Sequence, residues 1–295
     1  MNNWLLFVVI GQFFYAAVVL TDRFIITKGV VPKPIVYTFY VGLLSIFAIG
    51  ALPFGVTLPS GTTIGLSIIA AVSYVLSIYL LYESLKKSNP SEVVPVVGGI
   101  AAISAFISSA LILNTGLPGH FLTGFAILVA GMLLISHFRF TTRAFLFLFG
   151  SGVFFGLSTV IIKAILENET FVNGFFWSRM ANVLVAISFL LVPRIYTAIK
   201  EDIGRPNKSG KTTMVVGNKI LAGMGFLCIL IALKFGNASI VNALTATQYV
   251  FLLIFAVFFS KLLPEYFEET VHRHEFLHKS LATGLIVVGF VVLFL

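Results

Sequence analysis

The chain consists mainly of long uncharged stretches separated by short polar segments. Charged side chains are absent from residues 1–21, 34–82, 93–138 and 280–295. About 20 apolar residues form a helix long enough to cross a bilayer. The hydrophobic runs are continuous rather than alternating, which indicates membrane-spanning helices and excludes a membrane barrel.

We predict an all-α integral membrane protein with ten transmembrane helices. Turn residues interrupt the apolar stretches at Pro32 and Pro34, from Pro53 to Pro59, at Asn89-Pro90 and over residues 114–119. The first segment lacks a basic leader and a cleavage site, so we expect a retained span rather than a signal peptide. The predicted spans are residues 4–21, 34–52, 62–84, 93–113, 120–138, 144–165, 173–192, 214–233, 239–262 and 277–295.

The second half of the chain repeats the layout of the first. An offset of 140 residues aligns Pro53 with Pro193, and an offset of 148 aligns residues 85–91 with 233–239. Each half holds five apolar segments, and because five is odd the second half must enter the membrane from the opposite side. This predicts two inverted five-helix repeats, an arrangement that secondary transporters use for alternating access. The predicted domains are residues 1–138 and 139–295.

Composition and charge restrict the class of protein further. Hydrophobic residues make up 59% of the chain and charged residues 10%, compared with about 25% charged in an average soluble domain. The net charge of +8 arises from basic residues in short loops. We therefore interpret it as a topology signal and expect no nucleic-acid partner. The single cysteine, Cys228, lies in an apolar segment, which excludes a disulfide framework and a thiolate metal site. We expect no cofactor.

Lysine and arginine are distributed unequally between the two sides of the predicted bundle. The odd-numbered loops with the adjacent span ends hold 16 of the 19 basic residues, and the opposite side holds Lys163, Arg179 and Lys234. The positive-inside rule then predicts cytoplasmic odd-numbered loops and both termini outside, in the plasma (inner) membrane.

Two turn segments resemble a known family. Residues 82–96 and their counterpart 232–244 are similar to the turn between the third and fourth spans of the EamA-like family of the drug/metabolite transporter superfamily. Thr123-Gly124 and Thr283-Gly284, which open the last span of each half, also resemble that family. The resemblance implies ten spans in two inverted halves and transport of small organic metabolites, amino acids or drugs without ATP hydrolysis.

The sequence departs from the family pattern in two respects. Many members carry Leu-Gly-Glu after the fourth and ninth spans, whereas this chain has residues 114–116 (Asn-Thr-Gly) and 263–265 (Leu-Pro-Glu). The resemblance to ten-span family members also implies that both termini lie in the cytoplasm. The charge distribution of this chain predicts the opposite orientation.

Arg179 is the least expected residue, because it lies about seven residues, or roughly 10 Å, inside the seventh predicted span. Intramembrane ionisable groups usually face the bundle interior or a wet cavity. Asn182 lies one turn further on the same face. We interpret Arg179 as an anchor for an anionic or zwitterionic substrate. The alternative is snorkelling, or pairing with Glu167 or Glu169 beyond the sixth span.

A polar stripe on the ninth span is a second candidate site. The four residues are spaced three or four apart, and their counterparts between Val94 and Ala101 are apolar, so the fold does not require this polarity. We interpret the stripe as substrate-facing; interhelical hydrogen bonding is the alternative. The stripe consists of Asn242, Thr245, Gln248 and Tyr249. Weaker candidates, for which ordinary core packing is the favoured alternative, are Gln12, Tyr15, Tyr74 and Ser77.

Acidic residues near the span ends are candidates for proton coupling. Glu83 and Glu92 bracket the turn between the third and fourth spans, and Asp22 closes the first span on the same side. Buried carboxylates titrate near neutrality and could relay protons. The favoured interpretation is that they form ion pairs of little energetic weight at the interface.

Two further motifs are interpreted as coincidences. Residues 274–278 match the zinc-protease pattern HExxH, but no His, Asp or Glu follows to complete a ligand set. Residues 204–212 resemble a phosphate-binding loop with one residue too many, and no strand precedes them.

We interpret the chain as a secondary transporter of a small organic metabolite that is amino-acid-like, anionic, zwitterionic or drug-like. The alternatives are a membrane enzyme acting on lipid-linked substrates and a non-transporting scaffold. We expect the lipid bilayer and a small molecule as partners, and leave open whether two copies form a homodimer.

Overall fold

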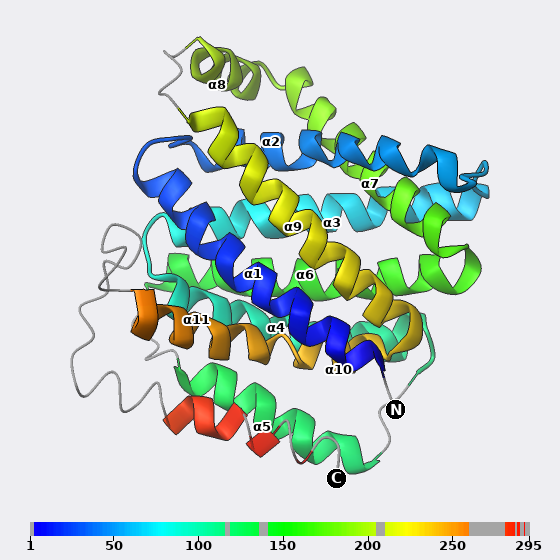
Figure 1. Cartoon of the computed structure of the whole chain (residues 1–295), viewed down its shortest axis with the longest axis vertical. Coiled ribbons are helices and arrows are strands. Elements are labelled where there is room, and N and C mark those ends of the chain that lie inside the picture. Colours follow the sequence, from blue (N-terminus) through cyan, green and yellow to red (C-terminus); the bar gives the residue numbers. More distant parts are fainter. Residues whose placement is uncertain are drawn as a thin grey trace.

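A computed structural model describes residues 3–115, 119–135, 141–204, 210–259, 281–286, 288–289 and 292 (Figure 1). These residues form a bundle of helices, of which eight are long and apolar enough to cross a membrane; Phe121–Leu134 is a shorter apolar helix. The HExxH match and Glu265 lie outside the described residues, as does much of the tenth predicted span. The elements are α1 (Asn3–Thr27), α2 (Pro34–Leu44), η1 (Ser45–Phe54), α3 (Gly61–Leu85), α4 (Pro90–Ile112), α5 (Gly119–Ile135), α6 (Thr142–Asn168), α7 (Phe171–Ser188), η2 (Phe189–Leu191), α8 (Pro193–Ile203), α9 (Lys211–Phe235), α10 (Ala238–Ala243) and α11 (Ala246–Phe259).

Local sequence explains where these helices begin. The hydroxyl oxygens of Ser60, Thr141 and Thr170 accept hydrogen bonds from backbone N–H groups in the first turns of α3, α6 and α7. Pro34 and Pro90 occupy the first position of α2 and α4, where the missing N–H has no helical partner to lose. Over the described residues, most predicted spans agree with the helices to within a few residues; the first does not, because α1 continues to Thr27 rather than ending at residue 21.

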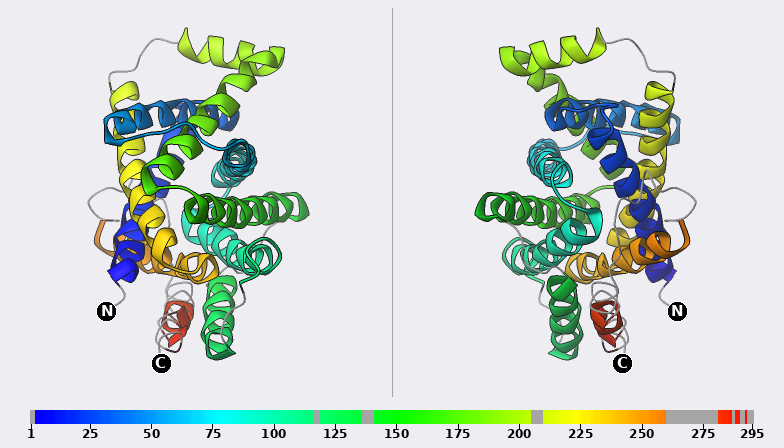
Figure 2. Two further views of the ribbon diagram at one scale, coloured as in Figure 1. Left: turned by 90° about the vertical axis from the view of Figure 1, so that its right-hand side faces the viewer. Right: turned by 90° about the vertical axis from the view of Figure 1, so that its left-hand side faces the viewer.

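Helix α8 was not predicted from the sequence. It lies beyond α2 at one end of the molecule, between the seventh and eighth spans, where a loop was expected (Figures 1 and 2). Ile199 is buried, whereas Arg194 and Lys200 are exposed, so the helix is amphipathic. The Tyr40 hydroxyl donates to Asp202 at 2.8 Å and attaches α8 to α2. An amphipathic helix at the end of a bundle suits the membrane interface.

The ninth predicted span is broken in the structure. Helix α10 ends at Ala243 and α11 starts at Ala246, with Leu244 and Thr245 between them. The carbonyl oxygen of Asn242 accepts from both the Thr245 hydroxyl at 2.7 Å and the Thr245 backbone N–H at 3.0 Å, which closes a tight turn at the interruption. Discontinuous spans place backbone groups near substrate in transporters.

The two halves of the chain interleave. Helix α6 packs along α3 and α4, and α1 packs along α9 and contacts α11 (Figures 1 and 2). Helix α5 covers α4 from outside, and residues 281–286 lie beside α5, with Ile286 and Ala282 close to Gly131. Residues of both halves therefore share the same core clusters.

Small residues on α6 permit its close approach to α4. A Cβ atom added to Gly156 would lie 2.4 Å from the Ala101 carbonyl oxygen, and one added to Gly152 would lie 2.8 Å from that of Val97. Backbone atoms cannot move aside cheaply. The Gly152–Gly156 pair is therefore a packing motif of the kind that membrane helices use for close association.

Substitution Gly156→Ala is expected to destabilise the protein, because the methyl group forces α6 away from α4. Overpacking of this kind typically costs about 1–3 kcal/mol. Thermal unfolding in mild detergent measures the effect. Gly217→Ala in α9 is the matched control, since no atom lies within 4 Å of its added Cβ. Equal melting temperatures for both variants would contradict the close α4–α6 contact.

Candidate functional site

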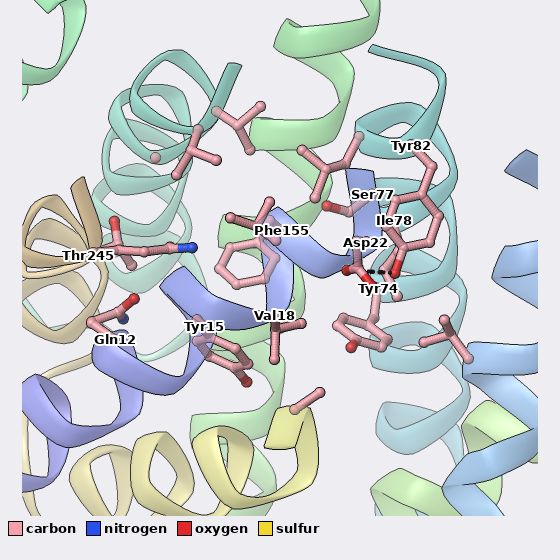
Figure 3. Close-up of a pocket in the computed structure, with 18 of the residues that line it drawn as sticks. Gln12, Tyr15, Val18, Asp22, Tyr74, Ser77, Ile78, Tyr82, Phe155 and Thr245 are labelled. Atoms are coloured by element: carbon pink, nitrogen blue, oxygen red, sulfur yellow. Dashed lines mark hydrogen bonds between the residues drawn. The ribbon is translucent and has the colours of Figure 1, made fainter. Parts of the chain in front are cut away.

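A cavity of about 150 Å³, which we call the central cavity, lies among the helices (Figure 3). Its walls come from α1, α2, α3, α4, α6, α9 and the broken ninth span, and therefore from both halves of the chain. Sequence-predicted residues such as Gln12, Tyr74 and Thr245 are labelled around it in Figure 3. Six of the ten predicted binding residues line this cavity: Gln12, Tyr15, Tyr74, Ser77, Thr245 and Gln248.

A smaller cavity of about 40 Å³ adjoins the central one. It shares Gln12, Tyr15, Tyr74 and Thr245 with the central cavity and adds two further predicted residues, which are Arg179 and Asn242. Ser158 and Thr159 of α6 also line it, and neither was a candidate from the sequence. The polar surface of the site thus continues from α1 to α7.

The remaining predicted residues lie elsewhere. Asn182 and Tyr249 are each only 1% exposed and line neither of these cavities. Glu83 in the last turns of α3 and Glu92 in the first turn of α4 are half-buried and also line neither cavity. Their proposed role in proton coupling stays a prediction.

Arg179 stacks on aromatic rings in the interior. Its guanidinium carbon lies 3.5 Å from the centroid of the Phe226 ring and 5.4 Å from that of Tyr74. Because Arg179 is two turns into α7, its charge is held at membrane depth. The flat guanidinium pairs well with aromatic faces, which stabilises the cation without neutralising it.

Within the described part of the chain, no carboxylate lies within ion-pair distance of Arg179. The two carboxylates considered from the sequence have other partners: Glu167 lies 3.5 Å from Lys163, and Glu169 accepts hydrogen bonds from Thr63 and Asn173. The Nε atom of Arg179 has no hydrogen-bond partner among the described residues. The geometry therefore offers an unneutralised cation to whatever occupies the site.

A second polar cluster lies at the other end of the central cavity, and sequence analysis missed it. The Lys219 ammonium lies 2.7 Å from Oδ1 of Asp22, and both side chains are less than 8% exposed. Three further groups donate to the carboxylate: the Tyr37 hydroxyl at 2.5 Å, the Asn218 amide at 2.6 Å and the Tyr82 hydroxyl at 3.1 Å. Asp22, Tyr82 and Lys219 line the cavity.

The interpretation of Asp22 as part of a weak interfacial pair was wrong. Helix α1 continues to Thr27, so Asp22 lies within the helix rather than at its end, and Lys219 lies two turns inside α9 rather than at the span end to which the charge count assigned it. The overlooked signal was the apolar pair Ile25 and Ile26, which continues the buried face of α1 beyond the charged residues.

The two clusters differ in net charge. Asp22 and Lys219 neutralise one another, whereas Arg179 adds a positive charge that the described residues do not balance. Buried ions in membranes are rarely left uncompensated unless a cavity admits water or a ligand. The site is therefore electrostatically suited to an anionic group.

These features define a multi-pass helical membrane protein with a polar cavity shared by both halves. Residues 142–267 match the family model of the EamA-like transporter family, a member of the drug/metabolite transporter superfamily. This match confirms the family resemblance predicted from the sequence. No curated protein matches the chain.

The fold as a whole is similar to that of a solved structure described as "Crystal structure of protein". The TM-score is 0.66 with 17% sequence identity, and the similarity covers 98% of each chain. At this level of identity the likeness shows a common fold and nothing about the ligand.

Proposed function

We propose that this protein is a secondary transporter that moves a small organic anion or zwitterion across the membrane by alternating access. Arg179 carries the proposal, because its guanidinium lines an interior cavity and lacks a carboxylate partner in the described structure. A carboxylate or phosphate on the substrate would supply the missing negative charge and accept two parallel N–H bonds. The polar groups of α1 and of the broken ninth span would orient the rest of the molecule.

We further propose that the two halves are inverted repeats, with α1 to α5 corresponding to α6, α7, α9, the α10–α11 pair and the C-terminal helix. Reciprocal packing supports this relation. The first span packs along the eighth as α1 on α9, and the third packs along the sixth as α3 on α6. Exchanging the halves converts one of these contacts into the other. Such a relation allows one half to rock against the other around a central site.

The Asp22 cluster would then act at one end of the transport path. It joins α1 to α2, α3 and α9 through the bonds to Tyr37, Tyr82 and Lys219. By the charge distribution this end is cytoplasmic, so the cluster would close the cavity toward the cytoplasm. Opening on that side would require at least one of these bonds to break.

A ligand screen on the purified protein tests the proposed function. A compound that binds the folded state raises the melting temperature by mass action. We expect short organic anions and zwitterions to stabilise the protein and organic cations of equal size to have no effect. Each stabilising compound is then offered to proteoliposomes and must accumulate chemically unchanged. Stabilisation by cations alone would contradict the role of Arg179, and chemical conversion would favour the enzyme alternative.

The proposed orientation places α8 in the cytoplasm and both termini outside. Single cysteines at Lys200 and Asn168, introduced after Cys228→Ala, report on opposite sides, and both positions are exposed. On intact cells, a membrane-impermeant thiol reagent is expected to label the cysteine at 168 and not the one at 200. The reverse pattern would overturn the charge-based orientation.

A further inference from the structure

A third cavity of about 350 Å³ opens at the side of the bundle, between α2 and η1, α7 and α9. Its size is that of a ligand pocket. Most of its wall is apolar. Arg179 and Tyr74 are polar residues on this wall, and both also line the smaller cavity of about 40 Å³. We call this third cavity the lateral chamber. Exposed apolar side chains form its rim: Phe47, Ile220, Met224 and Leu227.

A difference between the two halves creates the lateral chamber. On the opposite side, Ala71 and Val75 of α3 pack against Ala181 and Val185 of α7 in one closed hydrophobic cluster. At the 148-residue offset between the halves, Gly223 of α9 aligns with Val75 of α3. A Cβ atom added to Gly223 meets nothing within 4 Å, so α9 leaves the equivalent space open.

The facing wall is different as well. At the 140-residue offset, Val41 of α2 and Ser45 of η1 align with Ala181 and Val185 of α7, and both line the lateral chamber. Helix α9 makes few contacts with α2, whereas α3 packs along much of α7. The chamber is thus specific to the side where α9 faces α2, and the close packing of α3 against α7 at the symmetry-equivalent place shows that the fold itself does not require it.

The lateral chamber combines a mostly apolar wall with two cations, of which Lys219 is neutralised by Asp22 and Arg179 has no carboxylate partner among the described residues. The aromatic ring of Phe226 and the side chains of Leu44 and Phe175 lie on the wall, and the guanidinium of Arg179 rests on Phe226. An apolar tail suits the wall, because the rim opens where lipid surrounds the bundle. An acidic head group suits Arg179.

We propose that the lateral chamber binds a single-tailed organic anion, a carboxylate or phosphate carrying an alkyl or aryl tail, which reaches it from the bilayer. The tail lies between α2, α7 and α9, and the head group binds Arg179. This inference rests on the proposed function, because it uses Arg179 as the anion anchor, and it narrows the substrate class to amphiphiles.

Photolabelling in phosphatidylcholine nanodiscs tests the inference. The probe is palmitate with a diazirine on its tail, and the uncharged comparison is the corresponding alcohol. We expect the carboxylate to label the chamber-lining peptides of α9 and η1 at least about tenfold more than the alcohol, because the charge-assisted bond adds to the affinity only for the anion. Equal labelling by both probes would overturn the inference and show a site for ordinary acyl chains.

Matched variants locate the labelled site. Gly223 lines the lateral chamber, so Gly223→Phe places an aromatic ring inside it. Gly217→Phe adds the same side chain to α9 in open space that does not line the lateral chamber. Carboxylate labelling is expected to fall in Gly223→Phe, and in the milder Gly223→Leu, but not in Gly217→Phe. Arg179→Gln should reduce it to the level of the alcohol. Unchanged labelling in folded Gly223→Leu and Gly223→Phe would overturn the inference.

Short anions separate this inference from the proposed function. If benzoate stabilises the protein through Arg179 while labelling by the palmitate probe equals that by the alcohol, the amphiphile inference fails and the proposed function stands. If neither anion depends on Arg179, both fail. Stabilisation by benzoate that survives Gly223→Phe, together with loss of carboxylate labelling in that variant, supports both.

Discussion

Asp22→Ala is expected to destabilise the protein by about 3–5 kcal/mol, because it leaves the Lys219 ammonium buried without its counter-ion. The pair lies 2.7 Å apart with both side chains almost inaccessible. Lys219→Met leaves the opposite charge uncompensated and should cost a similar amount. The double variant Asp22→Asn with Lys219→Met removes both charges and should recover most of the lost stability. Thermal unfolding in one detergent and at one pH measures all three.

The pair formed by Lys33 and Glu201 is the matched control. Its atoms also lie 2.7 Å apart, but the side chains are 44% and 56% exposed. Water screens such a pair, so Lys33→Ala is expected to change stability by less than about 1 kcal/mol. Similar effects at the two pairs, or additive losses in the double variant, would show that the Asp22 cluster is hydrated rather than buried.

The spans were predictable from the sequence because a bilayer imposes a length and a polarity on each helix. Nine predicted spans coincide with described helices, although α1 is longer than predicted and the ninth span is broken, and residues 281–286 lie within the tenth. Helix α8 was missed because the prediction searched for long uncharged segments, and α8 contains charged residues such as Arg194 and Lys200. The spacing of its apolar residues is nevertheless helical.

The candidate site was predictable only where polarity departed from expectation. Arg179, Gln12 and Thr245 stood out as polar residues in apolar spans, and the structure brings them to adjoining cavities. Asp22 and Lys219 did not stand out, because each lay near a span end and was assigned to the interface. Whether such a residue faces water or protein depends on packing between α1 and α9, which lie far apart in the sequence.

The lateral chamber shows a further limit. When the halves are aligned, Gly223 of α9 is seen to stand opposite Val75 of α3. The alignment does not show that this difference leaves a cavity. A glycine can allow two helices to pack closely, as Gly156 does for α6 and α4, or it can leave a space, as Gly223 does on α9. All the contacts of the helix decide between these outcomes. Small residues alone therefore predict neither close packing nor an opening.

Arg179→Gln is expected to weaken the binding of anionic ligands strongly while leaving the fold intact. Loss of a buried charged hydrogen-bonding partner costs a complex about 2–5 kcal/mol, which corresponds to roughly 30-fold to several-thousand-fold in affinity. Arg179→Lys keeps the charge but loses the planar, two-pronged donor and its stacking on Phe226, so an intermediate loss is expected. Titration of a stabilising anion into each purified variant measures the affinities.

The stability of the same variants distinguishes a binding role from a structural one. Because the described residues supply no carboxylate to Arg179, its removal breaks no ion pair and relieves the cost of holding a cation at membrane depth. The lost contacts with the Phe226 and Tyr74 rings offset part of this gain, by about 0.5–2 kcal/mol. The melting temperature of Arg179→Gln should therefore stay near that of the parent or exceed it, in contrast to Asp22→Ala. A loss of stability as large as that of Asp22→Ala would identify Arg179 as a structural residue and remove the basis for an anion site.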